Sequence, residues 1–264
     1  MKATITQFDA RALESEWTRL RRHAAAEQPE LLLLPEMCFS PWFCASPRRS
    51  DLTWERAAHD HAYWLGRLPE LGARRIVGTA PRNIGGTAPR NIGGKRFNSA
   101  YLWTDDGGIR WIHHKTYLPN DDGYWEANWY DRAPIDFEPL CSGDLSLGIM
   151  ICTELWFMQH AREYGRRAVQ LLLNPRSTPL HTNDKWLAGG RAAAVVSGAF
   201  CLSSNHAGHA GRMELGGAGW ICDPDGVPLA TTSAEEPFVT LNLDLEMANE
   251  AKSTYPRYVD DCEF

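Results

Sequence analysis

A cysteine stands at the end of an apolar run near the middle of the chain, and a carboxylate follows two residues later. The run spans residues 147–151, and Cys152, Thr153 and Glu154 come directly after it. A short apolar run of this kind is typical of a buried strand, and α/β proteins place reactive groups where such strands end. Cys152 is therefore a candidate nucleophile. A cysteine nucleophile needs a base that removes its proton and a group that stabilises an oxyanion.

Two further strand ends carry groups that could supply the base and the oxyanion partner. Glu36 follows the leucines at 31–34 and Pro35. A carboxylate in apolar surroundings can act as a general base. Lys115 follows a predicted strand at 109–113, and a rigidly held lysine can polarise a carbonyl oxygen. Taken singly, Glu36 could also be a solvated strand end and Lys115 a surface lysine.

Other reactive motifs are missing from the sequence. His113, His114 and His206 are interpreted as ordinary polar residues, because none of them lies in a protease-like sequence context. The sequence has no Gly-x-Ser-x-Gly elbow. It also has no Cys-x-x-Cys pair, which would indicate zinc or thioredoxin chemistry. We therefore expect neither a metal nor a cofactor.

Strand-like and helix-like segments alternate along the chain. Apolar runs predict strands at 31–34, 147–151, 169–173 and 199–202, and helices are predicted at 11–27, 51–70, 157–168 and 184–198. Further strands are predicted at 75–80, 98–103, 109–113, 219–222, 227–232 and 238–243. This alternation is typical of a layered α/β fold, and the polar residues after the four apolar runs suggest one shared rim. No linker divides the chain, so we expect one domain over residues 1–264.

The composition argues against several classes of protein. The 264 residues carry a net charge of −6, with 44% hydrophobic and 23% charged residues. A nucleic-acid-binding protein needs a basic face, and a membrane helix needs roughly 18 consecutive apolar residues. The N-terminus lacks the apolar core of a signal peptide, and the seven cysteines are odd in number and dispersed. We expect a protein of the reducing cytoplasm that binds neither nucleic acid nor membrane.

An octapeptide is repeated in the first half of the chain. Gly-Thr-Ala-Pro-Arg-Asn-Ile-Gly occurs at 78–85 and again at 86–93. Two copies of eight residues do not make a solenoid, which indicates a tandem duplication within a hairpin loop. Loop-closure entropy grows slowly with length, so a longer surface loop is tolerated. We expect the tip of this loop to be exposed and mobile.

Three motifs follow one another in a specific order along the chain. They are Leu34-Pro35-Glu36, His114-Lys115-Thr116-Tyr117-Leu118-Pro119 and Ile151-Cys152-Thr153-Glu154. Together with Asn98-Ser99-Ala100 and the unit from Trp186 to Asn205, this set resembles the nitrilase superfamily of carbon-nitrogen hydrolases over nearly the whole chain. The resemblance implies a four-layer αββα sandwich with a Glu-Lys-Cys triad.

The resemblance also implies a role for each motif. Glu36 would be the general base, Lys115 the cation that stabilises the oxyanion, and Cys152 the nucleophile. Glu126 matches the family's second glutamate, which helps to hold the lysine and orient the substrate. The backbone N–H of Thr153 would complete the oxyanion hole. Such a site forms a thioester on the cysteine and releases ammonia or an amine from a small-molecule substrate.

The residue after the nucleophile bears on the substrate. True nitrilases of the superfamily usually have Trp at this position, so Thr153 favours an amide or carbamoyl compound over a nitrile. The alternatives are a nitrilase, an acyltransferase with an acceptor other than water, a glutaminase-like partner role and a non-catalytic binding module on the same fold. The binding module is disfavoured because all four residues of the matched catalytic set are present.

Candidate substrate-binding residues surround the second and third apolar runs. Five side chains could line the site: Trp156, Arg176, Ser177, Thr178 and His181. Arg176 either pairs with a substrate carboxylate through both of its terminal nitrogens or caps a neighbouring loop. The predicted helices at 157–168 and 184–198 resemble those that pair subunits in the family, so we expect a homodimer or a larger homo-oligomer.

Overall fold

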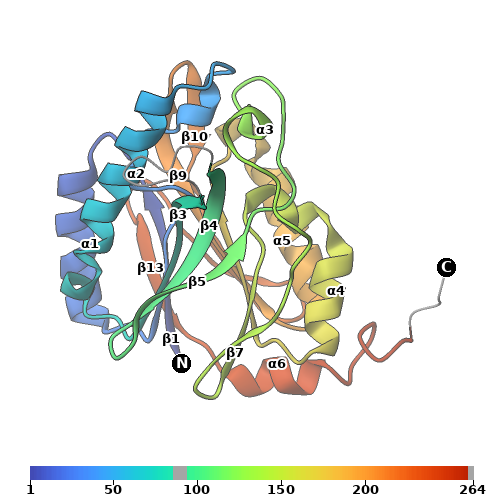
Figure 1. Cartoon of the computed structure of the whole chain (residues 1–264). Helices are drawn as coiled ribbons and strands as arrows, with labels where there is room; N and C mark the ends of the chain where they lie inside the picture. Colours follow the sequence, from blue (N-terminus) through green and yellow to red (C-terminus); the bar gives the residue numbers. More distant parts are fainter. Residues whose placement is uncertain (86–93, 261–264) are drawn as a thin grey trace.

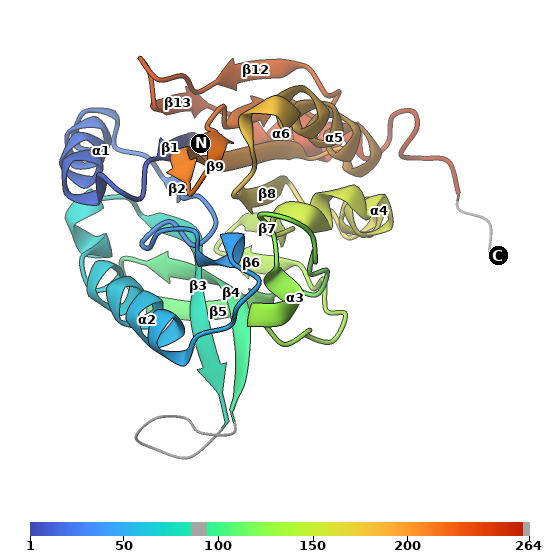
Figure 2. The same cartoon turned by 90° about the horizontal axis from the view of Figure 1, so that it is seen from above.

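The strands of the protein lie between two pairs of helices. The computed structural model describes residues 1–85 and 94–260. Helices α1 (Leu13–Glu27) and α2 (Asp51–Leu65) cover one side of the strands (Figure 1). Helices α4 (Met158–Arg166) and α5 (Asn183–Ser197) cover the other side, as the view from above confirms (Figure 2). The layered α/β arrangement predicted from the sequence is thus confirmed.

The N-terminal strands form one half of a continuous sheet. Their order is β5, β4, β3, β2 and β1, and β13 pairs with β1. Strands β1, β2 and β3 are parallel, whereas β3, β4 and β5 are antiparallel neighbours. The bounds are β1 (Lys2–Phe8), β2 (Leu31–Leu33), β3 (Arg75–Ile84), β4 (Lys95–Thr104), β5 (Gly108–His114) and β13 (Phe238–Asn242).

The other half of the sheet joins the first through β1. Residues Gln7 and Phe8 of β1 pair in parallel with Asn205 and His206 of β9, and β8 and β7 continue in parallel from β9. The carboxyl ends of β2, β7 and β8 therefore share one rim. The bounds are β6 (Leu140–Ser142), β7 (Leu145–Ile149), β8 (Leu171–Arg176), β9 (Phe200–Ala210), β10 (Met213–Gly216), β11 (Trp220–Cys222) and β12 (Pro228–Thr231).

Short helices carry or border this rim. Helix α3 (Glu126–Trp129) follows the Lys115 segment, and the 3₁₀ helix η3 (Cys152–Trp156) follows β7. The remaining short helices are η1 (Phe43–Ala45), η2 (Leu68–Leu71), η4 (Leu180–Thr182) and α6 (Leu245–Ala251). Glu36, Lys115 and Cys152 therefore each lie one to three residues beyond the end of a strand.

The leucine run of β2 shows how the layers are held together. Side chains of a strand alternate between its two faces. Leu31 and Leu33 accordingly lie in a buried cluster with side chains of β7 and β8. Leu32 and Leu34 lie in a second cluster with side chains of α1 and α2. All four are fully buried, and burying one leucine contributes about 1.5–3 kcal/mol. The run thus fixes the position of Glu36, two residues further on.

Some predicted elements end at different residues. Helix α2 ends at Leu65 rather than at 70, because Gly66 follows and Pro69 has no N–H for a helical bond. Strand β8 begins at Leu171 and continues to Arg176, because residues 174–176 pair with β9. Strand β7 ends at Ile149, two residues before the predicted end, and η3 begins at Cys152.

The duplicated octapeptide lies at the hairpin between β3 and β4. The first copy belongs largely to β3, which pairs with β4 as far as Ile84 and Lys95. The second copy, residues 86–93, lies outside the described residues, as does the predicted loop tip. Across residues 1–85 and 94–260, no helix has the length and apolar character needed to span a membrane.

Candidate active site

Three buried charged side chains meet at the rim of the sheet. The Nζ of Lys115 lies 2.8 Å from Oε1 of Glu36, and 2.8 Å and 2.7 Å from the two carboxylate oxygens of Glu126. Asn98 of β4 donates from Nδ2 to the same Glu36 oxygen at 2.7 Å. All four residues are buried. The structure therefore brings together three of the four catalytic residues that the resemblance implied.

The charges of this cluster do not balance. Burial raises the pKa of Glu126 to about 8, with Lys115 opposing the shift and Glu36 reinforcing it. Burial alone would lower the pKa of Lys115, but the two carboxylates outweigh it and hold the pKa well above its usual value. Lys115 therefore stays cationic. It faces two carboxylates, Glu36 and Glu126, and its single positive charge can neutralise only one of them.

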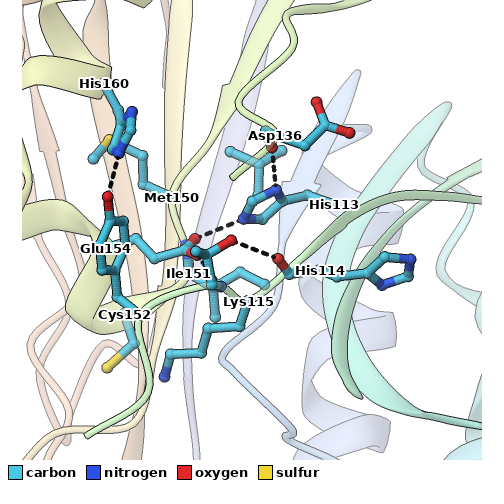
Figure 3. Close-up of polar contacts among 12 residues, drawn as sticks. His113, His114, Lys115, Asp136, Met150, Ile151, Cys152, Glu154 and His160 are labelled. Carbon is cyan, nitrogen blue, oxygen red and sulfur yellow. Dashed lines mark hydrogen bonds and ion pairs between the residues drawn. The ribbon is translucent and has the colours of Figure 1, made fainter. Parts of the chain in front are cut away.

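Cys152 lies beside the cluster on a turned backbone. Its φ is +46°, a conformation that is uncommon for residues with a side chain. Asn174 of β8 holds this turn, because its Nδ2 donates to the carbonyls of Met150 and Cys152 at 2.6 Å and 3.2 Å. Figure 3 shows the Cys152 sulfur and the Lys115 ammonium pointing to the same side. The turn thus aims the thiol at the charged cluster.

The thiol of Cys152 is protonated in this environment. Burial raises its pKa, and the charge of Glu36 raises it further, while Lys115 opposes the shift. Its Sγ lies 4.0 Å from the carbonyl oxygen of Ser177. The thiolate is the form of cysteine that attacks, so a nucleophilic reaction here needs a base to remove the proton.

The backbone around Glu36 is held from three sides. Its N–H contacts the carbonyl of Arg176 at 3.4 Å, and its carbonyl accepts from Nε2 of His206 at 2.6 Å. The next residue, Met37, has a φ of +52° and donates its N–H to Oγ1 of Thr79 at 2.8 Å. These contacts orient the carboxylate toward Lys115.

Several buried polar atoms near the cluster have no hydrogen-bond partner among the described residues. They are Oε2 of Glu36, Oδ1 of Asn98, Oγ of Ser177 and the hydroxyl of Tyr124. Burial raises the pKa of Tyr124, and negative charge at Cys152 raises it further, so its hydroxyl lies within electrostatic reach of the nucleophile. Unpaired buried polar groups are unfavourable, and these four could bind polar groups of a substrate.

The predicted pocket residues divide into two groups. Thr153 lies in the first turn of η3, where backbone N–H groups have no partner within the helix. Ser177 contacts Cys152, and the N–H of Thr178 donates to Oδ1 of Asn205 at 2.9 Å. Trp156 instead packs on Trp186 of α5, with ring centroids 5.0 Å apart.

The guanidinium of Arg176 is occupied by protein groups. It donates to Oγ of Ser203 at 3.0 Å, to the Thr178 hydroxyl, and to the carbonyls of Gly217 and Ala218 at 3.3 Å and 2.6 Å. It also lies 4.3 Å from the ring centroid of Trp220. The residue is fully buried. The geometry therefore favours the loop-capping interpretation over the pairing with a substrate carboxylate.

A cleft of about 810 Å³ opens at Gly123, which precedes Tyr124 in the chain. It is lined by Ala45, Asp122, Gly123, Leu180, His181, Ala210, Gly211, Arg212, Met213 and Glu214. Two of these residues are acidic and two are arginine or histidine. The sequence indicates His181 as a pocket residue but does not indicate the tip of the hairpin between β9 and β10. Residues 210–214 line the cleft only because the fold places this hairpin there, so no local sequence pattern indicates their role.

Two of the histidines interpreted as ordinary polar residues are buried next to candidate site residues. His206 is buried and bonds the Glu36 carbonyl, and burial lowers its pKa to about 4. His113 is also buried, and its Nε2 lies 2.8 Å from Oε2 of Glu154. His114 is half-buried, with Nδ1 2.6 Å from the Ser99 hydroxyl. One sequence signal was available for the His113 contact: Glu154 comes two residues after the candidate nucleophile Cys152.

Comparison with known proteins decides the family. The sequence model of the carbon-nitrogen hydrolase family matches residues 2–253. The chain belongs to this family. This carbon-nitrogen hydrolase is 22% identical over 261 residues to the N-carbamoylputrescine amidase of Arabidopsis thaliana, covering 92% of the chain and 84% of the relative. It is 30% identical over 109 residues to a 2-oxoglutaramate amidase of Paenarthrobacter nicotinovorans, covering 41% of the chain but only 37% of that relative.

Solved structures share the fold of this carbon-nitrogen hydrolase. A carbon-nitrogen hydrolase from Helicobacter pylori G27 superposes with a TM-score of 0.84 at 19% identity, covering 99% of this chain and 95% of that one. A mutant of the Nesterenkonia AN1 amidase from the nitrilase superfamily has a TM-score of 0.75 at 19% identity, covering 95% and 94%. The predicted membership of the carbon-nitrogen hydrolases is thus confirmed, and the two solved structures confirm the α/β fold.

Proposed function

We propose that the enzyme hydrolyses the C–N bond of a small amide or carbamoyl compound through a thioester on Cys152. The observation that carries this proposal is the buried cluster of Glu36, Lys115 and Glu126 beside a protonated thiol. The cluster offers an unpartnered carboxylate oxygen to take a proton and a cation to receive negative charge. The Nesterenkonia amidase, in a crystal showing covalent addition at its active-site cysteine, provides a chemical parallel.

In the first half of the reaction, Glu36 takes the thiol proton while the sulfur of Cys152 attacks the substrate carbonyl carbon. The carbonyl oxygen becomes an oxyanion that lies between the ammonium of Lys115 and the N–H of Thr153. One such donor is typically worth about 3 kcal/mol of transition-state stabilisation. Glu36 then gives its proton to the departing nitrogen. Ammonia or an amine leaves, and the acyl group stays on the sulfur as a thioester.

In the second half, Glu36 accepts a proton from water as the water oxygen attacks the thioester carbon. The same donors hold the second oxyanion. When the C–S bond breaks, the proton on Glu36 returns to the sulfur, and the acid product leaves. Glu126 binds Lys115 through both carboxylate oxygens, so in this scheme it positions the cation.

The cleft at Gly123 is our candidate for the substrate path. Its charged residues are of both signs: Asp122, Glu214, Arg212 and His181. The relatives named above act, by their names, on an amide that carries an acid group and on a carbamoyl compound of a diamine. Both charge types therefore belong in a substrate screen. A homodimer or larger assembly through α4 and α5 stays a prediction.

An ammonia-release screen tests the proposed reaction. It should include aliphatic, aromatic and ω-carboxyl amides, carbamoyl compounds and nitriles, with Cys152→Ala as the matched blank. Release from an amide or carbamoyl compound that disappears in Cys152→Ala supports the proposal. Release from nitriles alone would favour the nitrilase alternative, and transfer to added amine or hydroxylamine without hydrolysis would favour an acyltransferase. Unchanged activity in Cys152→Ala would contradict the mechanism.

A further inference from the structure

Glu154 lies between the segment that carries Lys115 and the segment that carries Cys152. Its side chain is fully buried. The backbone N–H of Thr116, next to the lysine, donates to Oε1 at 2.7 Å. The backbone N–H of Ile151, next to the cysteine, donates to Oε2 at 2.7 Å. One carboxylate therefore ties together two segments that follow different strands, as Figure 3 shows.

His113 completes this link. Its Nε2 lies 2.8 Å from Oε2 of Glu154, and its Nδ1 lies 2.9 Å from the carbonyl oxygen of Asp136. An ionised carboxylate and a carbonyl can only accept, so both contacts are hydrogen bonds only when both ring nitrogens carry protons. Burial alone would lower the pKa of His113, but Glu154 outweighs it and raises the pKa. The pair is thus neutral as a whole, which reduces the penalty for burying its charges.

Aromatic rings shield the pair. The ring of Phe137 lies 4.9 Å from that of His113 and stacks at 3.7 Å on His160. The hydroxyl of Tyr117 lies 2.9 Å from Nε2 of His160. Hydrogen bonds in such surroundings are stronger than in water, and an unpaired partner is correspondingly unfavourable. The link is therefore a stiff one.

We propose that Glu154 is a positioning residue for the reaction: it sets the placement of Lys115 relative to Cys152, and His113 holds its carboxylate in place. This inference rests on the proposed function of those two residues. Both oxygens of Glu154 are occupied by backbone and imidazole donors, so it acts through them. A displacement of about 1 Å between reacting groups can lower a rate about 100-fold.

The matched pair of variants is Glu154→Gln and Tyr164→Phe. Glutamine keeps the size of the side chain but has a single acceptor oxygen, so the N–H of either Thr116 or Ile151 loses its partner. The buried hydroxyl of Tyr164 contacts the backbone N and O of Ile149 in β7, at 3.3 Å and 3.1 Å. Removing it also deletes a buried polar contact near the cysteine, but leaves the link intact.

We expect Glu154→Gln to lower kcat by about 10- to 100-fold while KM changes by less than about threefold. Tyr164→Phe should leave kcat within about twofold of the wild type. If Glu154→Gln loses thermal stability but keeps kcat within that range, Glu154 is merely structural and the proposal is overturned. If that variant does not fold, Glu154→Asp replaces it. Aspartate keeps the charge but is too short to reach both segments, and the same kcat criterion applies.

Hydrogen exchange separates this inference from the proposed function. We expect whichever amide loses its partner in Glu154→Gln, that of Thr116 or that of Ile151, to exchange at least about tenfold faster, and both amides to be unchanged in Tyr164→Phe. This readout needs no substrate. Unchanged exchange at both amides would overturn the link. Faster exchange together with a wild-type enzyme that hydrolyses none of the screened compounds would uphold the link and contradict only the proposed function.

Discussion

Two buried carboxylates, Glu36 and Glu154, flank the reacting groups and differ in how their oxygens are used. Both side chains are fully buried. Oε1 of Glu36 accepts from Asn98 and Lys115, but its Oε2 has no partner among the described residues. Both oxygens of Glu154 are occupied, by two backbone N–H groups and an imidazole. A carboxylate oxygen without a hydrogen-bond donor can accept a proton. A carboxylate whose two oxygens both accept hydrogen bonds instead fixes the positions of its donors.

The two sites also differ in charge balance. Lys115 faces both Glu36 and Glu126, so this cluster has one negative charge in excess if both carboxylates are ionised. Glu154 instead pairs with His113, whose pKa it raises. The excess, added to burial, accounts for the raised pKa of Glu126. Protonation of Glu126 below about pH 8 therefore removes the excess charge of the reactive site.

The largest expected effect comes from removing the nucleophile. Cys152→Ala should lower kcat/KM by about 10,000-fold or more, because the thioester route is lost entirely. Cys201→Ala is the matched control. Cys201 is also buried, and burial likewise raises its pKa, yet it lies within β9 and should change kcat/KM by less than about threefold. If both variants lost the same factor in kcat/KM, the loss would come from disturbed packing and not from removal of the nucleophile.

Glu36→Gln should lower kcat by about 100- to 10,000-fold, the range for loss of a general acid-base group. Glutamine keeps the contacts to Asn98 and Lys115 within reach but cannot accept the proton. Amide exchange at Thr116 and Ile151 should stay unchanged, in contrast to Glu154→Gln. Faster exchange in Glu36→Gln would show that the two carboxylates do not have separate roles.

Lys115→Met should lower the free energy of unfolding by about 3–5 kcal/mol, because two carboxylates then stay buried without their cation. The double variant with Glu126→Gln removes one of these charges and should recover part of the stability but none of the activity. Urea unfolding of the wild type, the single and the double variant measures this. A single variant as stable as the wild type would contradict the buried ion cluster.

The last comparison concerns the pH dependence of stability. The pKa of Glu126 rises from 4.5 to about 8 on folding, so the folded state binds more protons than the unfolded state between these values. The resulting stability is fully present below about pH 4.5 and is lost as pH rises to about 8, by up to about 1.4 kcal/mol per pH unit. Glu126→Gln should flatten urea-unfolding stability over this window. Parallel curves for the two proteins would contradict the assignment.

The sequence was informative where function depends on position along a strand. Apolar runs report burial, so the ends of β2 and β7 were predicted to within two residues, and with them the placement of Glu36 and Cys152 beyond these strands. The order of the three motifs then identified the family, which is confirmed. The roles of Glu36, Lys115, Glu126 and Cys152 stay proposals that the geometry supports.

Contacts between distant segments could not be read from local patterns. The partners of Glu154 are backbone N–H groups at 116 and 151, which approach each other only when the two halves of the sheet pack. The sequence allows two interpretations of Arg176, because its acceptors at 217 and 218 belong to a loop some 40 residues away. The cleft lining was missed for the same reason, since it needs the position of the hairpin at 210–214.

One measurement tests the central claim most directly. The enzyme is mixed with an amide that it hydrolyses and quenched in acid during turnover, and its intact mass is determined, followed by peptide mapping. The account predicts an added acyl group, located on Cys152, at a level that falls once the substrate is consumed. Turnover with no acyl group on the protein, or with the group on another residue, would contradict it.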